Sequence, residues 1–166
     1  MPEKETLERA REDAREGKSP STQAGEFVRE EIHHIREGKH GARSTQQAIA
    51  IGLSKARRAG VKLKPPKKGT TSEETRRASA RDTRKGSSGS KKKTSPTRSR
   101  AMLKRLKREG RSAASPQALA KQARSAARRR SAASRSASAK KASRTKGPAR
   151  RRAAAKKGAR TRARRR

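Results

Sequence analysis

Branched apolar residues are concentrated in one stretch of the chain, residues 42–63, whose sequence is ARSTQQAIAIGLSKARRAGVKL. Small and apolar residues recur there at helical spacing, which indicates a helix with one apolar face. These residues are Ala48, Ile49, Gly52, Leu53 and Ala56. Because three of them are Ala or Gly, a second helix can approach this face closely.

Local signals mark both ends of this helix. Ser44 and Gln47 form the spacing of a capping box, in which each side chain satisfies a backbone N–H at the helix start. Gly60 is suited to the left-handed conformation that ends a helix, and Val61 is placed for the apolar contact beyond it. The pattern predicts a helix over residues 45–59 followed by an extended arm.

A partner for this helix is predicted just before it. Residues 21–37 carry an apolar stripe at helical spacing and end at Gly38, whereas residues 2–16 form a charged helix with Leu7 on a thin apolar stripe. The fold class expected is therefore mostly α, with a helical hairpin at 19–63, or a three-helix cluster if Leu7 joins, of marginal stability. Its expected core consists of Phe27, Val28, Ile32, Ile35, Ile49 and Leu53.

The second half of the chain has a different composition. After a stiff exit through Pro65 and Pro66 we expect a basic linker over 64–98, rich in Pro, Gly and Ser, with a possible short helix at 72–84. Residues 99–166 are rich in Ala, Ser, Lys and Arg, and only 27% of all 166 residues are hydrophobic, with a single Phe and no Tyr or Trp. This tail is predicted to be largely disordered, with transient helices that form on binding. The expected organisation is a charged helix at 1–18, the hairpin domain at 19–63, the linker at 64–98 and the tail at 99–166.

Charge divides the chain in the same place. The net charge is +37, yet residues 1–82 hold 19 Lys and Arg against 13 Asp and Glu, whereas residues 83–166 hold 32 against one. So dense a positive charge favours a polyanionic partner, because cations that neutralise phosphates release counterions. The residues expected to bind nucleic acid are Lys39, Arg43, Lys55, Arg57, Arg58, Lys91, Lys92, Lys93, Arg98, Arg100, Lys104, Arg105, Arg124, Arg128, Arg129, Arg130, Lys140, Lys141, Arg150, Arg151, Arg152, Lys156 and Lys157.

The residues from Arg43 to Val61, RSTQQAIAIGLSKARRAGV, resemble a bacterial and phage domain family of unknown function. The resemblance extends over about Ser19 to Pro66. Members of that family are labelled DNA-binding, histone-like or plasmid-stabilisation proteins, and the basic tail is similar in composition to histone H1-like tails. The resemblance implies a DNA-binding or histone-like role and assigns no chemistry to named residues.

Three short motifs allow more than one interpretation. Ser95-Pro96-Thr97-Arg98 resembles the minor-groove elements of histone H1 tails, but it also suits the entry turn of a helix. The loop 38–41 has the G-x-x-G spacing of the KH backbone clamp, although a helix stop plus linker is preferred because no strands are predicted nearby. A helix-turn-helix would make 45–59 the recognition helix, with Gln46 and Gln47 facing bases, yet the connection 38–44 is long for that motif.

Catalytic and metal-binding chemistry are not expected. The chain has no Cys, and adjacent His33 and His34 point about 100° apart on a helix, so together they cannot ligate one metal. The carboxylates Glu30, Glu31 and Glu37 lack an aromatic or apolar pocket, which argues against an enzyme and against a cofactor. The scarcity of aromatic residues also favours duplex backbone binding over stacking on single strands.

The sequence therefore predicts a cytoplasmic, nucleoid-associated protein that binds duplex DNA through phosphates without reading sequence. Its start does not have the pattern of a signal peptide, and no apolar run approaches the length of a membrane span. The alternatives are an RNA- or ribosome-associated interaction protein whose hairpin binds a protein partner, and a plasmid-stabilisation factor. Self-association through the hairpin stays open.

Overall fold

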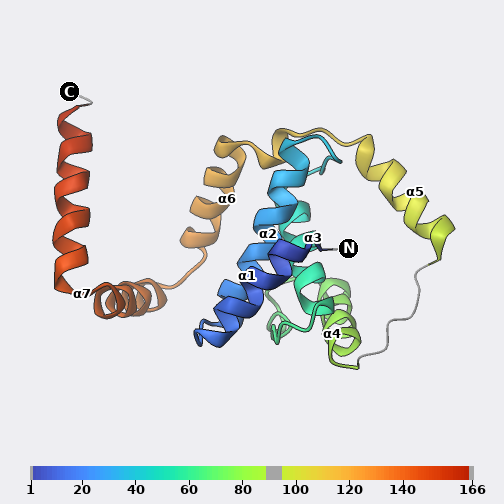
Figure 1. The fold of residues 1–166 in the computed structure, drawn as a ribbon, viewed down its shortest axis with the longest axis horizontal. Coiled ribbons are helices and arrows are strands. Elements are labelled where there is room, and N and C mark those ends of the chain that lie inside the picture. Colours follow the sequence, from blue (N-terminus) through green and yellow to red (C-terminus); the bar gives the residue numbers. More distant parts are fainter. Residues whose placement is uncertain (1, 89–94, 165–166) are drawn as a thin grey trace. The chain divides into compact units, whose positions relative to one another are not determined.

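Every regular element of the described chain is helical (Figure 1). A computed structural model describes residues 2–88 and 95–164, together with the side chains of these residues except those of 145 and 146. Two compact units are distinguished, residues 1–122 and residues 123–166. The elements are α1 (Lys4–Arg15), α2 (Pro20–Arg36), α3 (Thr45–Arg58), α4 (Glu73–Ser87), α5 (Pro96–Lys107), the 3₁₀ helix η1 (Ser112–Ala114), α6 (Pro116–Arg128) and α7 (Ala132–Ala163).

The start of α3 follows the predicted capping pattern with one difference. Ser44 Oγ accepts a hydrogen bond from the backbone N–H of Gln47 at 3.2 Å, as expected. The Gln47 side chain, however, accepts from the backbone N–H of Arg43 at 2.9 Å, one residue earlier than the reciprocal bond of a capping box. The cap therefore also fixes the last residue of the preceding loop.

The end of α3 is a Schellman motif. Gly60 has a φ of 95°, its N–H donates to Arg57 O, and the N–H of Val61 donates to Ala56 O. Val61 then packs beside Ala56 in the core, which is the apolar contact that the sequence predicted beyond the cap. Leu63 of the extended arm that follows packs against the same cluster.

Helices α2 and α3 form the most extensive helix pair of the described chain. A Cβ placed on Gly52 of α3 would lie only 2.7 Å from Val28 Cα on α2, which confirms that small residues bring the two helices close. On one side of this pair Ala10, Ala24, Phe27 and Ala56 form a buried cluster. Leu7 packs against that cluster, so α1 completes a three-helix arrangement.

A second buried cluster contains residues from the far end of the same unit. Ile32, Ile35, Ala42 and Ala48 pack with Ala113 and Ala114 of η1, and Val28 and Leu119 lie against them. Two polar contacts fasten η1 in place: Thr45 Oγ1 donates to Ala113 O at 2.7 Å, and Arg36 Nε donates to Ala114 O at 2.9 Å.

Helix α4 packs on α3 through small and polar residues. A Cβ on Gly86 would lie 1.9 Å from the carbonyl oxygen of Arg57, so only glycine fits at this contact. Asp82 accepts hydrogen bonds from Ser54 Oγ at 2.6 Å and from Arg58 Nε at 2.9 Å. The linker expected over 64–98 therefore contains a helix that belongs to the fold of the first unit.

The prediction of a long disordered tail is wrong. Residues 95–164 form α5, η1, α6 and α7, and the only part of residues 95–166 left undescribed is 165–166. Alanine has the highest helix propensity, and serine caps supply hydrogen-bond acceptors at helix starts, as Ser115 does for Ala118 N–H and Ser131 for Ser134 N–H. These local preferences outweigh the repulsion of neighbouring cations, which amounts to a few tenths of a kcal/mol per pair, about 0.2–0.5.

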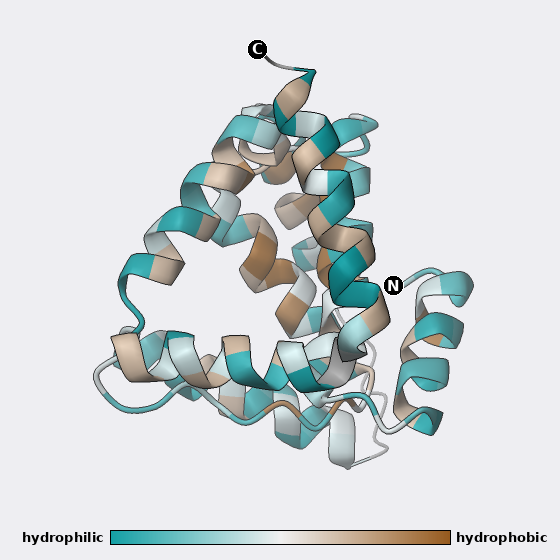
Figure 2. Ribbon diagram, turned by 90° about the vertical axis from the view of Figure 1, so that its left-hand side faces the viewer, coloured by the Kyte–Doolittle hydropathy of each residue, from teal (hydrophilic) through white to brown (hydrophobic). Residues whose placement is uncertain are grey.

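Helix α7 is interrupted once. Gly147, at φ 64° and ψ 168°, separates two helical segments, and Pro148 begins the second of them. Figure 2 shows teal residues interleaved with pale ones along the helix that ends at the C-terminal label, without a continuous brown stripe. The second unit therefore displays polar and cationic side chains in place of an apolar face. None of the helices in the described parts of the chain is both long and apolar enough to cross a bilayer.

Candidate nucleic-acid interface

The predicted phosphate-binding cations of the hairpin are largely engaged within the fold. Lys55 Nζ lies 3.2 Å from Glu30 Oε1 and 2.7 Å from Glu31 Oε2, and both carboxylates are almost fully buried. Burial favours the neutral amine of Lys55, but the attraction of Glu31 and Glu30 outweighs it and raises its pKa. Lys55 therefore serves as the counter-ion of two buried acids.

Two neighbouring arginines are also held within the fold, one by burial and one by an ion pair. The side chain of Arg57 is buried, its Nε has no hydrogen-bond partner among the described residues, and this burial lowers its pKa. Arg58 pairs with Asp82 of α4 at 2.9 Å. Arg58 joins α3 to α4 and Arg57 is buried, so both side chains are poorly placed to contact phosphate.

The cations of the loop after α2 differ from one another. Lys39 is exposed but lies 3.1 Å from Glu37 and 3.2 Å from Glu3, and these carboxylates raise its pKa. Arg43 is exposed as well, and its backbone N–H donates a hydrogen bond to Gln47 Oε1. Of the five hairpin cations that the sequence singled out, Arg43 is therefore the one with an exposed side chain that makes no ion pair among the described residues.

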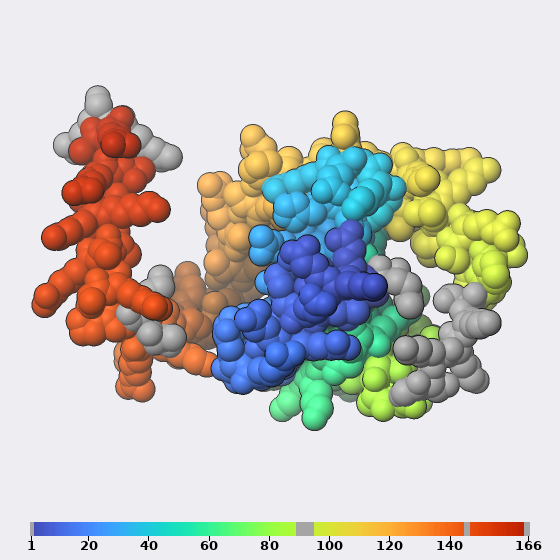
Figure 3. All heavy atoms as spheres, in the orientation of Figure 1, coloured from blue at the N-terminus to red at the C-terminus, as the bar shows by residue number. Residues whose placement is uncertain are grey.

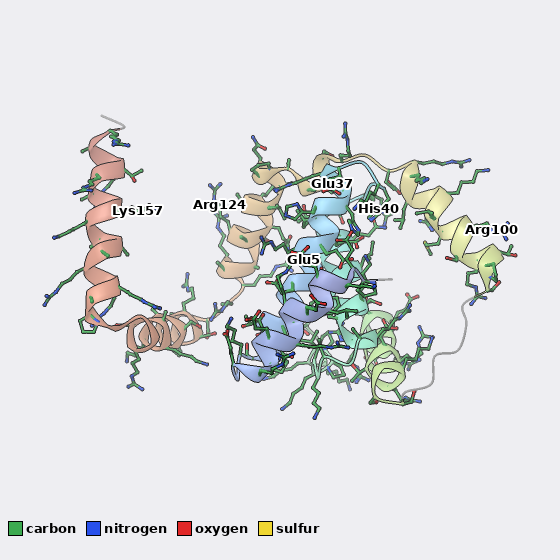
Figure 4. The ribbon with its side chains drawn as sticks, viewed as in Figure 1. Glu5, Glu37, His40, Arg100, Arg124 and Lys157 are labelled. Carbon is green, nitrogen blue, oxygen red and sulfur yellow. The ribbon has the colours of Figure 1, made fainter. Side chains whose placement is uncertain are left out.

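The described cations of the predicted set in the second half of the chain are exposed to solvent, and all lie on helices except Arg129 and Arg130, which lie between α6 and α7. In the first unit they are Arg98, Arg100, Lys104 and Arg105 on α5. In the second unit they are Arg124, Arg128, Arg129, Arg130, Lys140, Lys141, Arg150, Arg151, Arg152, Lys156 and Lys157. Figure 4 shows Arg100, Arg124 and Lys157 on α5, α6 and α7, and Figure 3 shows the long side chains of the C-terminal segment projecting outward. Lys91, Lys92 and Lys93 lie outside the described residues.

Carboxylates are almost absent from this half. Glu109 is the only acidic side chain in residues 83–166, and the ion pairs found in the described chain all use carboxylates of residues 3–82. The positive charge of these exposed side chains is offset by one carboxylate, Glu109, within residues 83–166. Their chemistry is that of charge neutralisation, because Lys and Arg contacts with phosphates carry no sequence information.

The structure also places the ambiguous motifs. Pro96 is the first residue of α5, so Ser95-Pro96 is a helix entry turn. Gly38, at φ 78°, closes α2 with a bond from the N–H of Lys39 to His34 O, which makes the 38–41 loop a helix stop. In the first turn of α3, Thr45 is buried under η1, whereas Gln46 is exposed and its Nε2 lies 3.4 Å from Gln122 Oε1 on α6. The contacts of this turn with η1 and α6 do not favour its insertion into a groove.

The expected core residues are buried to different degrees. Phe27, Ile32 and Ile35 are buried. Val28 and Leu53 are half-buried against the two clusters, and Ile49 is half-buried without belonging to either. Sequence reasoning missed that alanines supply much of the core and that Glu30 and Glu31 lie inside it, because neither residue type normally signals burial.

One family model matches the chain: residues 17–68 correspond to DUF6496, a family of unknown function. The match contains α2, α3 and the loop between them, and it agrees with the resemblance noticed in the sequence. No curated protein and no solved structure matches the chain. The comparisons therefore support membership of the α2–α3 region in a domain family, and no named relative supports a DNA-binding or histone-like role.

Proposed function

We propose that this protein binds duplex DNA without sequence specificity, as a histone-like, nucleoid-associated protein, through the phosphates that contact α5, α6 and α7. The observation that carries the proposal is the set of exposed cations on these helices, combined with a single carboxylate in residues 83–166. It acts as a binding protein and not as an enzyme.

The division of charge supports separate roles for the two ends of the chain. Residues 1–82 hold 19 Lys and Arg against 13 Asp and Glu, and several of these cations stabilise the fold through ion pairs. In residues 83–166 the net charge is +31, which the fold does not neutralise. Affinity for a polyanion therefore resides in the second half, and the helical cluster around α2 and α3 is the scaffold.

Backbone binding fits these side chains better than base reading. Discrimination of base pairs in the major groove uses Arg, Asn or Gln held in fixed geometry by a supporting fold. In α7 the basic side chains are interspersed with Ala and Ser on an exposed helix, and the hydrogen bond from Arg151 Nε to the carbonyl oxygen of Gly147 at 3.3 Å is local to that helix. Such cations follow the spacing of phosphates, and every duplex offers the same phosphates.

Replacement of cations with neutral Gln tests the proposal with the full-length chain. One variant replaces Arg150, Arg151, Arg152, Lys156 and Lys157 of α7 with Gln, which preserves helix propensity. The control replaces five exposed cations of the first unit with Gln, namely Lys4, Arg11, Arg15, Lys67 and Lys68. Both variants lose the same net charge, so they separate local contact from overall attraction.

Fluorescence anisotropy with a labelled duplex gives the affinities. We expect the α7 variant to lose at least about tenfold in affinity and the salt slope to flatten by up to about 4.5, since each phosphate contact contributes about 0.9. The control should change the affinity far less. Equal losses in both variants would contradict binding through α7, and tighter binding of an RNA duplex than of DNA would assign the same phosphate chemistry to RNA.

A further inference from the structure

Two of the three histidines of the chain meet a buried carboxylate at the end of α2. Glu31 and His34 lie one turn apart on α2, and the stop at Gly38 turns the loop back so that His40 joins them. One ligand atom from each of Glu31, His34 and His40 lies within 4.8 Å of the others. The two imidazole rings stand edge to face, with their centroids 6.1 Å apart. Figure 4 shows His40 beside the end of α2, which Glu37 marks.

Glu31 is the unusual member of this group. Its side chain is 1% exposed, and neither carboxylate oxygen has a hydrogen-bond partner with proper geometry among the described residues. A buried carboxylate without such bonds is costly. Lys55 Nζ approaches Oε2 at 2.7 Å and offsets part of the charge, but Oε1 faces His40 Nε2 at 3.1 Å.

The contacts of the two ring nitrogens of His40 indicate how the ring faces Glu31 Oε1. His40 Nδ1 lies 3.1 Å from the carbonyl oxygen of Gly41, a contact that is favourable only when Nδ1 carries the proton. The neutral ring then presents the lone pair of Nε2 to a carboxylate oxygen. Two acceptors at this distance repel each other, and either a second proton on the ring or a metal ion at the contact removes that repulsion.

We propose that Glu31, His34 and His40 bind a divalent transition-metal ion of the kind that prefers imidazole, with Zn²⁺ as its representative. Two imidazoles and one carboxylate form a recurring zinc donor set, and an open fourth position accepts water. In a tetrahedral site the ligand atoms lie about 3.4 Å apart, close to the 3.1 Å between Glu31 Oε1 and His40 Nε2. Small side-chain shifts bring the third ligand atom to the same spacing.

The surroundings supply the outer contacts that metal-bound histidines use. The carbonyl oxygen of Gly41 holds the His40 ring, and Glu3 Oε1 lies 2.8 Å from His34 Nε2. The same loop is joined to the end of α5 and to the segment after it, because Gly41 N–H donates to Leu106 O and Ala42 N–H donates to Gly110 O. A bound ion therefore stabilises the loop on which the α5–η1 connection is docked.

Metal binding is tested on the full-length chain after removal of metals with a chelator. Isothermal titration calorimetry with Zn²⁺ gives the affinity, and the visible absorption of bound Co²⁺ reports the coordination. We expect His34→Asn and His40→Asn to weaken Zn²⁺ binding by at least about tenfold. The matched control is His33→Asn, because His33 is the adjacent, exposed histidine, and this change should leave binding intact.

A second variant guards against loss of the fold. His40→Cys retains a zinc ligand at this position, so it should retain Zn²⁺ binding and give the intense Co²⁺ absorption of a thiolate. Far-UV circular dichroism verifies that each variant keeps its helices. The proposal is overturned if Zn²⁺ does not bind, if His33→Asn weakens binding as much as His40→Asn, or if binding survives the loss of both His34 and His40.

Discussion

At the residue scale, the contact between α2 and α3 depends on the side chain that Gly52 lacks. A Cβ there would lie 2.7 Å from Val28 Cα and 2.9 Å from Val28 N, both backbone atoms that cannot rotate away. We expect Gly52→Ala to separate the helices and to lower the free energy of unfolding by about 1–3 kcal/mol. Urea unfolding followed by circular dichroism measures the change.

The matched control for this prediction is Gly25→Ala in α2. Gly25 is also inside a helix, but a Cβ on it would meet nothing within 4 Å. Alanine there should stabilise the protein by about 0.5–1 kcal/mol through helix propensity alone. If Gly52→Ala stabilised the protein as Gly25→Ala does, the close approach of the two helices would be wrong.

At the element scale, one short sequence occurs three times and adopts a different structure each time. Arg-Ser-Ala-Ala occurs at 111–114, at 124–127 and at 130–133. The first copy contains the 3₁₀ helix η1 with its alanines buried, the second lies inside α6 and the junction to α7 contains the third. Tertiary contacts with Thr45 and Arg36, not local propensity, select the structure of the first copy.

This difference between the copies gives the next prediction. Ala114→Asp places a carboxylate at a fully buried position, whereas Ala127→Asp adds the same charge at the equivalent, exposed position of the second copy. We expect Ala114→Asp to release η1 from α2 and α3 at a cost of several kcal/mol, about 2–5, and Ala127→Asp to cost little. Hydrogen exchange of η1 and of the first turn of α3 reports the release, and equal protection in both variants would contradict the docking.

The same example shows how far the sequence could predict the fold. Caps and apolar stripes located α1, α2 and α3 within a few residues, because these signals are local. The docking of η1 and the packing of α4 rest on Ala113, Ala114, Asp82 and Gly86, whose residue types are common on surfaces and in turns. For the candidate metal site, Glu31-x-x-His34 was visible at helical spacing, but the return of His40 depends on the loop conformation.

At the scale of the whole molecule, the distribution of charge led to a wrong prediction of disorder in the second half of the chain. The +31 of residues 83–166 suggested a solvated coil, yet helix propensity and caps give α5, η1, α6 and α7 within the described residues 95–164. The cations on α5, α6 and α7 are therefore displayed by preformed helices. A preformed array loses less conformational freedom on binding than a coil, while the electrostatic contribution is unchanged.

The last prediction concerns the salt dependence of that binding. If about eight cations engage phosphates at once, a plot of log K against log salt falls with a slope of about −7. Mixed-sequence and A·T-only duplexes should bind with affinities within about a factor of two, since phosphate contacts carry no sequence information. Gln46→Ala should leave both quantities unchanged, because Gln46 Nε2 lies 3.4 Å from Gln122 Oε1 on α6 and the phosphate contacts are proposed for other residues. Filter binding at several salt concentrations measures both, and a single sequence bound about a hundredfold more tightly, with loss of that preference in Gln46→Ala, would make α3 a recognition helix.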